Sequence, residues 1–300
     1  MPHLPTQDQG MDETQTERQR TSPTVRRHML AAELKELRRA AGLTHVDVAD
    51  RLGWPQAKVS KIEGSRQAVG VEAVIALADI CHAEGRHREH LVSLAHQARG
   101  RGWWDSYRDV LPPEDRLYIG FEAEAADVRV FGTEVLPELV RTRDYAAAVL
   151  AARRSAEPAA DSERSLEALE IRQRNLDSGG VPLDLVLAES ALRRVVGGPD
   201  VLRGQWDRLL EIAARAEVTL RVLPFAAGAL AADGPFTVLS FGADSPPAVV
   251  YRPALAVRPL LDSPTDVQVH QDAFDQLVES ALDPEESVRL LEKEVDRAKA

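Results

Sequence analysis

Residues 53–67, with the sequence GWPQAKVSKIEGSRQ, contain a short predicted helix with a polar face. Val59 and Ile62 are three residues apart, so both must face an interior. The opposite face carries an amide, a methyl group, a hydroxyl and an ammonium group, on Gln56, Ala57, Ser60 and Lys61. An amide and an ammonium near the N-terminus of a helix are side chains that can read base edges in the major groove of DNA. The segment therefore predicts base contacts.

A second helix and a tight turn precede this polar segment. Residues 43–53, LTHVDVADRLG, show helical apolar spacing at Val46, Ala49 and Leu52 and end in a glycine that suits a turn. A helix, a short turn and a second helix with exposed polar residues near its start form a helix-turn-helix motif, which places its second helix in the major groove. We therefore expect this motif to position the polar face.

The motif lies within residues 25–99, which we predict to form an all-α domain of five short helices separated by glycines. Apolar residues recur at helical spacing in the other helices as well. The clearest sets are Leu30, Leu34 and Leu37; Val71, Val74, Leu77 and Ala78; and Leu91, Leu94 and Ala95.

The charge of the chain is divided unevenly. Residues 26–66 hold nine basic and five acidic side chains, a formal charge of +4, whereas the whole chain of 300 residues carries −11 and the remainder therefore −15. An acidic protein repels phosphates, but a separate basic module can still bind them. This length and this distribution favour two domains, of which the basic one contacts double-stranded DNA.

The regions around the helical domain differ in composition. Residues 1–24 contain almost no large apolar side chains, which predicts a disordered tail. Residues 100–116 are rich in Gly, Pro and aromatic residues and predict a linker. Residues 117–300 predict an α/β or α+β domain with a small sheet, in which β-branched runs at 127–132, 184–190, 218–225, 236–241 and 248–252 form strands. We expect helices at 138–154, at 199–216 and, after an N-cap at Asp283, at the end of the chain.

Other chemistry-bearing residues favour structural interpretations. A possible metal cluster consists of Cys81, His82, His87, His90 and His96, but these residues spread over different helix faces. Glu122, Glu124 and Asp127 have no neighbouring His, Lys or Ser in the sequence and are interpreted as a solvated helix face. Trp103, Trp104 and Tyr107 are expected to pack as a hydrophobic hinge rather than to stack on bases. Without a phosphate loop, a nucleophile motif or metal-ligand spacing, we expect no catalytic site, metal or cofactor.

Cysteine content and hydropathy bear on localisation. Cys81 is the only cysteine, so no internal disulfide forms and a reducing compartment is expected. The sequence shows neither a signal-peptide core nor an apolar run that would cross a bilayer. We therefore expect a cytoplasmic protein without membrane contact.

The segments LKELRRAAGLT and VADRLGWPQAKVSKIEGSRQ resemble the lambda-repressor and Cro type of helix-turn-helix domain, also called the XRE type. The hydrophobic spacing, the two glycines and the ending VSKIEG carry this resemblance. It implies base contacts by Gln56, Ala57 and Lys61, with Ser60 beside them. It also implies phosphate contacts, which would come from Thr44, His45 and Arg66.

The same resemblance assigns structural residues and shows departures from the family pattern. Arg38 and Glu63 match a buried ion pair that ties the first helix to the third. His45 stands where Gln is common, so its phosphate contact would be sensitive to pH. Pro55 stands where Ser or Thr commonly caps the recognition helix, so that cap is missing.

The rest of the chain resembles the regulatory C-terminal domain of WhiJ-like actinobacterial regulators. The segments that carry this resemblance include RGWWDSY, LEIRQRNL and LRVLPFAAGALAADGPFTVLSF, and the two resemblances together cover residues 25–282. Departures occur at LPELVRT and at VVYRP, where an acidic residue is usual after Tyr251. Such regulators are typically encoded beside small BldB-like partner proteins, sometimes in antitoxin-like arrangements.

These observations lead to two hypotheses. In the first, the chain is a sequence-specific transcriptional regulator that binds DNA as a homodimer, because one such domain contacts too few base pairs to be specific in a genome. Its second domain would then sense a partner protein or a ligand. In the second, the chain is an antitoxin-like interaction module whose purpose is to bind a small BldB-like partner, and its DNA binding serves autoregulation.

Overall fold

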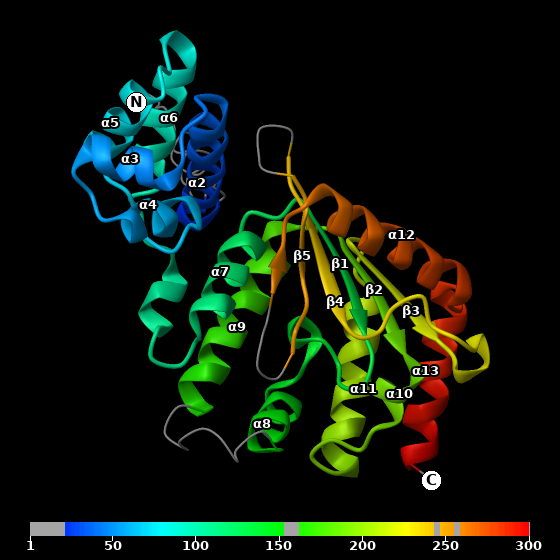
Figure 1. Cartoon of the computed structure of the whole chain (residues 1–300). Coiled ribbons are helices and arrows are strands. Elements are labelled where there is room, and N and C mark those ends of the chain that lie inside the picture. Colours follow the sequence, from blue (N-terminus) through cyan, green and yellow to red (C-terminus); the bar gives the residue numbers. More distant parts are fainter. Residues whose placement is uncertain (1–21, 153–161, 243–246, 255–258, 300) are drawn as a thin grey trace, which may run out of the picture. The chain divides into compact units, whose positions relative to one another are not determined.

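Figure 1 shows the computed structural model of the chain, which describes residues 22–152, 162–242, 247–254 and 259–299. The chain divides into two compact units between Trp103 and Trp104, and each is described by itself. Most of the predicted disordered tail, residues 1–21, lies outside the described residues. The end of that prediction is wrong, because Ser22 is the N-cap of the first described helix and Pro23 and Thr24 belong to that helix.

Within its described residues, the first unit consists of five α-helices, as predicted. They are α2 (Pro23–Ala40), α3 (His45–Leu52), α4 (Gln56–Glu63), α5 (Val71–Ile80) and α6 (Gly85–Gln97). Apolar side chains from all five helices form one core around Leu30, Ile62, Val74 and Leu91. The expected core position of Val46 is wrong: this side chain is exposed, and Val48 takes its place in the core.

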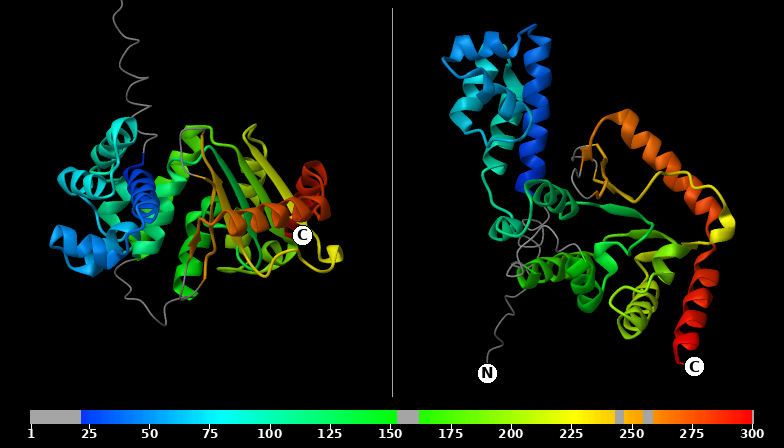
Figure 2. Two further views of the ribbon diagram at one scale, coloured as in Figure 1. Left: turned by 45° about the horizontal axis from the view of Figure 1, so that its top comes forward. Right: turned by 60° about the horizontal axis from the view of Figure 1, so that its bottom comes forward.

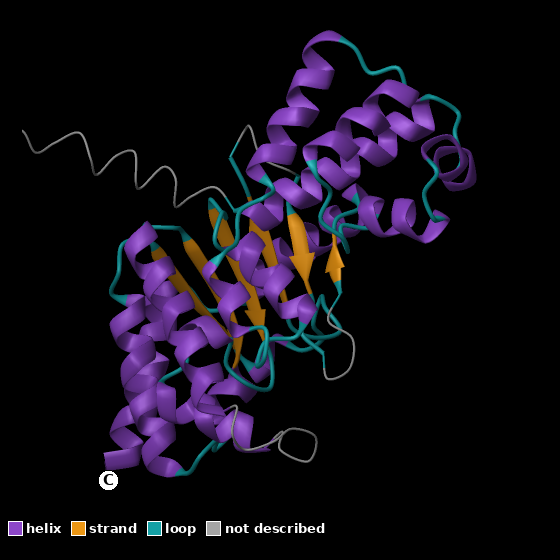
Figure 3. Ribbon diagram, turned by 90° about the vertical axis from the view of Figure 1, so that its left-hand side faces the viewer, coloured by secondary structure: helices purple, strands orange, loops and turns teal. Residues whose placement is uncertain are grey.

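The second unit is built on one six-stranded mixed sheet, which confirms the predicted combination of an all-α first domain with a sheet-containing second domain (Figure 3). The strand order is β3-β2-β1-β4-β5-β6. The strands are β1 (Asp127–Gly132), β2 (Leu183–Ala188), β3 (Val218–Leu223), β4 (Phe236–Ser240), β5 (Val249–Tyr251) and β6 (Leu260–Leu261). The first three are mutually parallel, and β4, β5 and β6 each run antiparallel to the preceding neighbour in the sheet. The two-residue β6 was not predicted, because it is too short to produce an apolar run.

Helices cover both faces of the sheet. The crossover from β1 to β2 contains α8 (Arg143–Ala152) and α9 (Ser162–Gly179), and the crossover from β2 to β3 contains α10 (Glu189–Arg193) and α11 (Pro199–Ala213). Both crossovers move in one direction along the sheet, and such connections are right-handed, so α9 and α11 lie on the same face. The right-hand view of Figure 2 shows α12 (Pro264–Ser280), in orange, on the opposite face. Phe274 and Leu277 of α12 pack there against Phe131 and Phe236.

The last helix, α13 (Pro284–Lys299), contacts α11 and β3. Its predicted N-cap is confirmed, since the Asp283 carboxylate accepts a hydrogen bond from the Glu286 amide at 2.7 Å. The Ser287 hydroxyl then accepts a hydrogen bond from the Val222 amide at 2.9 Å, which ties α13 to the edge strand. Among the described residues, no helix combines the length and apolar composition that a membrane crossing requires.

The single helix predicted over residues 138–154 is wrong. The structure contains a short 3-10 helix, η2 (Glu138–Val140), then an extended residue, Arg141, and then α8. The interruption is stable because a buried amide on another helix replaces the missing backbone hydrogen bonds. Gln205 of α11 accepts from the Thr142 amide at 2.7 Å and donates to the Val140 carbonyl at 2.8 Å.

The start of the second unit also differs from the prediction. The helix α7 (Pro113–Glu122) begins inside the segment predicted as a linker, and its Tyr118, Ile119 and Phe121 are buried. Glu122 is not on a solvated face, as interpreted from the sequence, but is 7 % exposed. It is held there by a buried arginine of α9, a partner 50 residues away that local sequence patterns do not indicate.

Candidate nucleic-acid interface

The helix α3, which precedes the recognition segment, begins with a reciprocal cap. The Thr44 hydroxyl accepts a hydrogen bond from the Asp47 amide at 3.2 Å, while the Asp47 carboxylate accepts from the Thr44 amide at 2.7 Å. These bonds satisfy donors at the helix start that would otherwise lack partners. The hydrogen bonds from Thr44 hold the pKa of the Asp47 carboxyl below its usual range. Thr44 is exposed at this helix N-terminus, which is where a phosphate would be expected to bind.

The turn between α3 and α4 depends on Gly53. This residue adopts the left-handed conformation, with φ of 63°, and ends α3. Side chains with a Cβ atom rarely adopt that conformation, so glycine sets the turn. Pro55 follows as the N-cap of α4, and no side chain caps the helix there, as the sequence predicted.

One face of α4 is buried in the core, and the opposite face is exposed. Val59 and Ile62 are 1 % and 2 % exposed and belong to the core of the unit. The four side chains predicted to contact bases are all exposed, and the structure brings them together on one side of a single helix: Gln56, Ala57, Ser60 and Lys61. Their roles toward DNA stay a prediction, but their shared exposure is the arrangement that such contacts require.

A cation–π contact at the start of α4 was missed at the level of the sequence. The Lys58 ammonium lies 3.6 Å from the centre of the Trp54 ring. This contact holds the Lys58 side chain across the turn and over an apolar ring that packs against the core. The four-residue spacing between the two side chains was the available signal, although spacing alone does not show that a lysine folds back.

A partly buried network of three residues connects α4 to the two preceding helices. Arg38 of α2 donates to both carboxylate oxygens of Glu63, at 2.7 and 2.8 Å, and to the Leu43 carbonyl at 2.6 Å. His45 of α3 lies on the same carboxylate, with its Nε2 atom 2.9 Å from Oε2. The network therefore joins α2, α3 and the end of α4, at the positions where the family resemblance implies an ion pair.

The electrostatics of this network favour its charged form. Burial by itself would raise the pKa of the Glu63 carboxyl, but the hydrogen bonds from Arg38 and His45 bring it below its ordinary value. The Glu63 hydrogen bond likewise raises the pKa of Arg38. Because the Nε2 atom of His45 faces Glu63, a phosphate contact by this ring would use Nδ1.

Arg66, the third predicted phosphate contact, follows α4 on a well-defined backbone. The Arg66 amide donates to the Lys61 carbonyl at 2.8 Å and the Ser65 amide to the Ile62 carbonyl at 3.0 Å. Ser65 adopts a positive φ of 56°, which turns the chain after the helix. These hydrogen bonds hold the backbone of Arg66 in place, and its side chain is exposed.

Two histidines of the possible metal cluster lie beside a glutamate. His87 and His90 both face Glu33, at 3.7 and 2.9 Å, whereas Cys81 is buried and burial raises the pKa of its thiol. Across the described residues, no three of the His, Cys, Asp and Glu side chains are grouped so that they could hold a metal ion.

Comparison with known families assigns both parts of the chain. A family model described as a helix-turn-helix domain matches residues 29–91, which include α3 and α4. A second model, described as a domain of unknown function, DUF5753, matches residues 115–293. The chain belongs to the DUF5753 family. Neither the curated proteins nor the solved structures contain a match to it.

These assignments establish the first part of the function. The DUF5753 chain carries a helix-turn-helix domain, the class of domain by which regulators bind DNA, and α4 is the second helix of its helix-turn-helix motif. The four exposed candidates therefore lie on the element that enters the major groove in this class of domain. The DUF5753 region begins within α7 and ends within α13, so it includes the whole sheet.

Proposed function

We propose that the chain is a sequence-specific transcriptional regulator of the XRE type, which inserts α4 into the major groove. Gln56, Ala57, Ser60 and Lys61 would read base edges, and Thr44, His45 and Arg66 would hold the phosphate backbone. The observation that carries this proposal is the exposure of all four base-reading candidates on one helix, whose opposite side is anchored in the core by Val59 and Ile62.

The proposed DNA-bound form is a homodimer in the cytoplasm. A single helix-turn-helix domain reads too few base pairs to find a site in a genome, so two domains are expected on half-sites about 10 base pairs apart. The acidic DUF5753 domain, which resembles WhiJ-like regulators, would sense a partner protein or ligand and would carry out no reaction. Its negative charge limits non-specific attraction to DNA and leaves specificity to the first domain.

The experiment compares base and phosphate contacts on a known operator. A genome-wide map of bound DNA gives the operator, and the affinity of wild type, Lys61→Ala and Gln56→Ala is then measured on operator and scrambled duplexes. Loss of a base-edge contact should weaken operator binding by about 1–3 kcal/mol and scrambled-DNA binding much less. Lys293→Ala, at an exposed lysine of α13, removes the same charge outside the helix-turn-helix domain and serves as the matched control.

The two sets of duplexes separate the possible results. Equal losses on operator and scrambled DNA would assign Lys61 to the phosphate backbone and contradict its proposed role in base reading. Unchanged operator affinity in both α4 variants would contradict the proposal that α4 reads the operator.

A further inference from the structure

A cavity of about 260 Å³ lies in the second unit, at the carboxyl end of β1. Its lining includes the last residues of β1, the following segment through η2, and the first residues of β4. At this point the parallel half of the sheet meets its antiparallel half, because β1 pairs with β2 on one side and with β4 on the other. In open α/β sheets, ligands bind in crevices outside the carboxyl ends of the strands.

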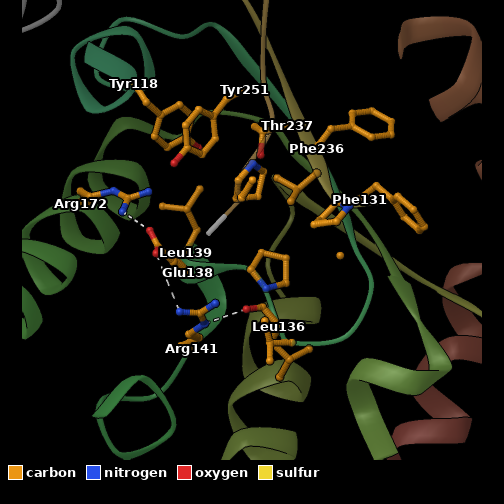
Figure 4. Close-up of a pocket in the computed structure, with 17 residues that line it drawn as sticks. Tyr118, Phe131, Leu136, Glu138, Leu139, Arg141, Arg172, Phe236, Thr237 and Tyr251 are labelled. Carbon is orange, nitrogen blue, oxygen red and sulfur yellow. Dashed lines mark hydrogen bonds and ion pairs between the residues drawn. The ribbon is translucent and has the colours of Figure 1, made fainter. Parts of the chain in front are cut away.

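The sheet supplies a flat wall made by three adjacent strands. Val130, Thr237 and Tyr251 are cross-strand neighbours in register, so their side chains point to the same face of the sheet. The Tyr251 ring stacks on Tyr118 of α7, with ring centres 4.0 Å apart and an angle of 18° between the planes. In Figure 4 the two rings lie together at one side of the cavity, beside Thr237.

The charged side chains that the structure describes at the cavity are paired with one another. Arg172 of α9 donates to both oxygens of Glu122, at 2.8 and 2.9 Å, and to Glu138 at 2.6 Å. Arg141 donates to the Leu136 carbonyl at 2.7 Å, and its guanidinium also faces Glu138, at 3.9 Å. Figure 4 shows the contacts from Arg172 through Glu138 and Arg141 to Leu136 along one side of the cavity.

This pairing selects against a charged occupant. An anionic ligand would have to compete with Glu122 and Glu138 for the arginines, and a cation would lose its hydration beside two guanidinium groups. Burial raises the pKa of Tyr118 well above its ordinary value, so the phenol of the aromatic wall is neutral as well.

Thr237 offers a polar group to an occupant. The residue is 6 % exposed and lines the cavity. A hydroxyl group can both donate and accept a hydrogen bond. A ligand that donates to this oxygen, or accepts from it, would form a hydrogen bond with the group.

We propose that this cavity binds a small uncharged molecule with a flat ring, which packs beside the Tyr118–Tyr251 stack and forms a hydrogen bond with the Thr237 hydroxyl. The proposal deepens the sensor role of the DUF5753 domain and rests on that proposed function for its regulatory meaning. The volume lies just below the usual range of small-molecule pockets, roughly 300–1,000 Å³, so a compact ligand fits.

The test uses four probes of nearly equal size on the full chain: benzyl alcohol, toluene, benzoate and benzylammonium. Binding is followed by saturation-transfer NMR titration at pH 7. Benzyl alcohol should bind saturably, and the two charged probes about tenfold more weakly or not at all. In Thr237→Val, which keeps the shape of the side chain, benzyl alcohol should lose about three- to tenfold in affinity because one hydrogen bond is lost, whereas toluene should lose nothing.

Thr219→Val, on the edge strand β3 and outside the cavity lining, is the matched control and should bind all probes as wild type does. Absence of saturable binding by benzyl alcohol, preference for a charged probe, or equal losses for benzyl alcohol and toluene in Thr237→Val would each overturn the proposal. Operator affinity is measured on the same samples. If the probes bind but the operator does not, the proposed regulatory function is contradicted and the proposed cavity site is not. If the operator binds but the probes do not, only the proposed cavity site is contradicted.

Discussion

Replacement of Arg38 by methionine tests the physical basis of the first unit. The Arg38 and Glu63 side chains are 11 % and 6 % exposed, and three hydrogen bonds of the guanidinium are lost in Arg38→Met. The variant leaves the Glu63 carboxylate buried without its main partner. Removing one partner of a buried ion pair costs about 3–5 kcal/mol.

The structure places the expected cost at the lower end of that range. His45 still faces the carboxylate at 2.9 Å and offsets part of the loss, and methionine fills the space of the arginine stem. We therefore expect the free energy of unfolding of the first unit to fall by about 3 kcal/mol. Because each 1.4 kcal/mol is a factor of ten, amide hydrogen exchange in α2 and α4 should become roughly a hundredfold faster.

Hydrogen exchange of the full chain, read by mass spectrometry of peptides from α2 and α4, measures this change without isolating the domain. The double variant Arg38→Met with Glu63→Leu is the matched control. It removes both charges, so most of the lost stability should return. A change of less than about 1 kcal/mol in Arg38→Met, or no recovery in the double variant, would refute the assignment of Arg38 and Glu63 to structure.

Three further outcomes are expected. The pKa of Glu63 is lowered on folding, so the stability that its carboxylate contributes is complete above the ordinary pKa of 4.5 and is lost as the pH falls below that value. In an acid titration, the free energy of unfolding of Glu63→Gln should therefore depend less on pH in that range than that of wild type. Arg172→Met strands the buried Glu122 and should lower the stability of the second unit by about 3–5 kcal/mol, whereas the exposed Arg143→Met should cost less than about 1 kcal/mol in the same denaturant titration. A fragment that ends at Arg99 lacks the acidic domain and should bind scrambled DNA more tightly than the full chain at low salt; equal affinities in a filter-binding titration would show that the domain does not repel DNA.

Local sequence patterns were sufficient to predict those helices and strands in which buried residues recur at a regular spacing. The spacing of Val59 and Ile62, with a glycine turn before them, predicted a recognition helix with a polar face, and the structure contains that helix at Gln56–Glu63. The β-branched run at residues 127–132 coincides with β1. Where periodicity allowed two choices, as for Val46 and Val48 in α3, only the packed core decided which side chain is buried.

The cavity in the second unit shows what the sequence by itself determined and what only the tertiary structure decided. The sequence determined that Thr237 lies in a strand and that Glu122 lies in a helix, because these are local properties of the chain. It did not reveal that Arg172, 50 residues after Glu122, would neutralise that carboxylate, or that Val130, Thr237 and Tyr251 would form one row. Strand order and helix packing bring these residues together, and both depend on contacts between distant segments, which leave no periodic signal in a single sequence.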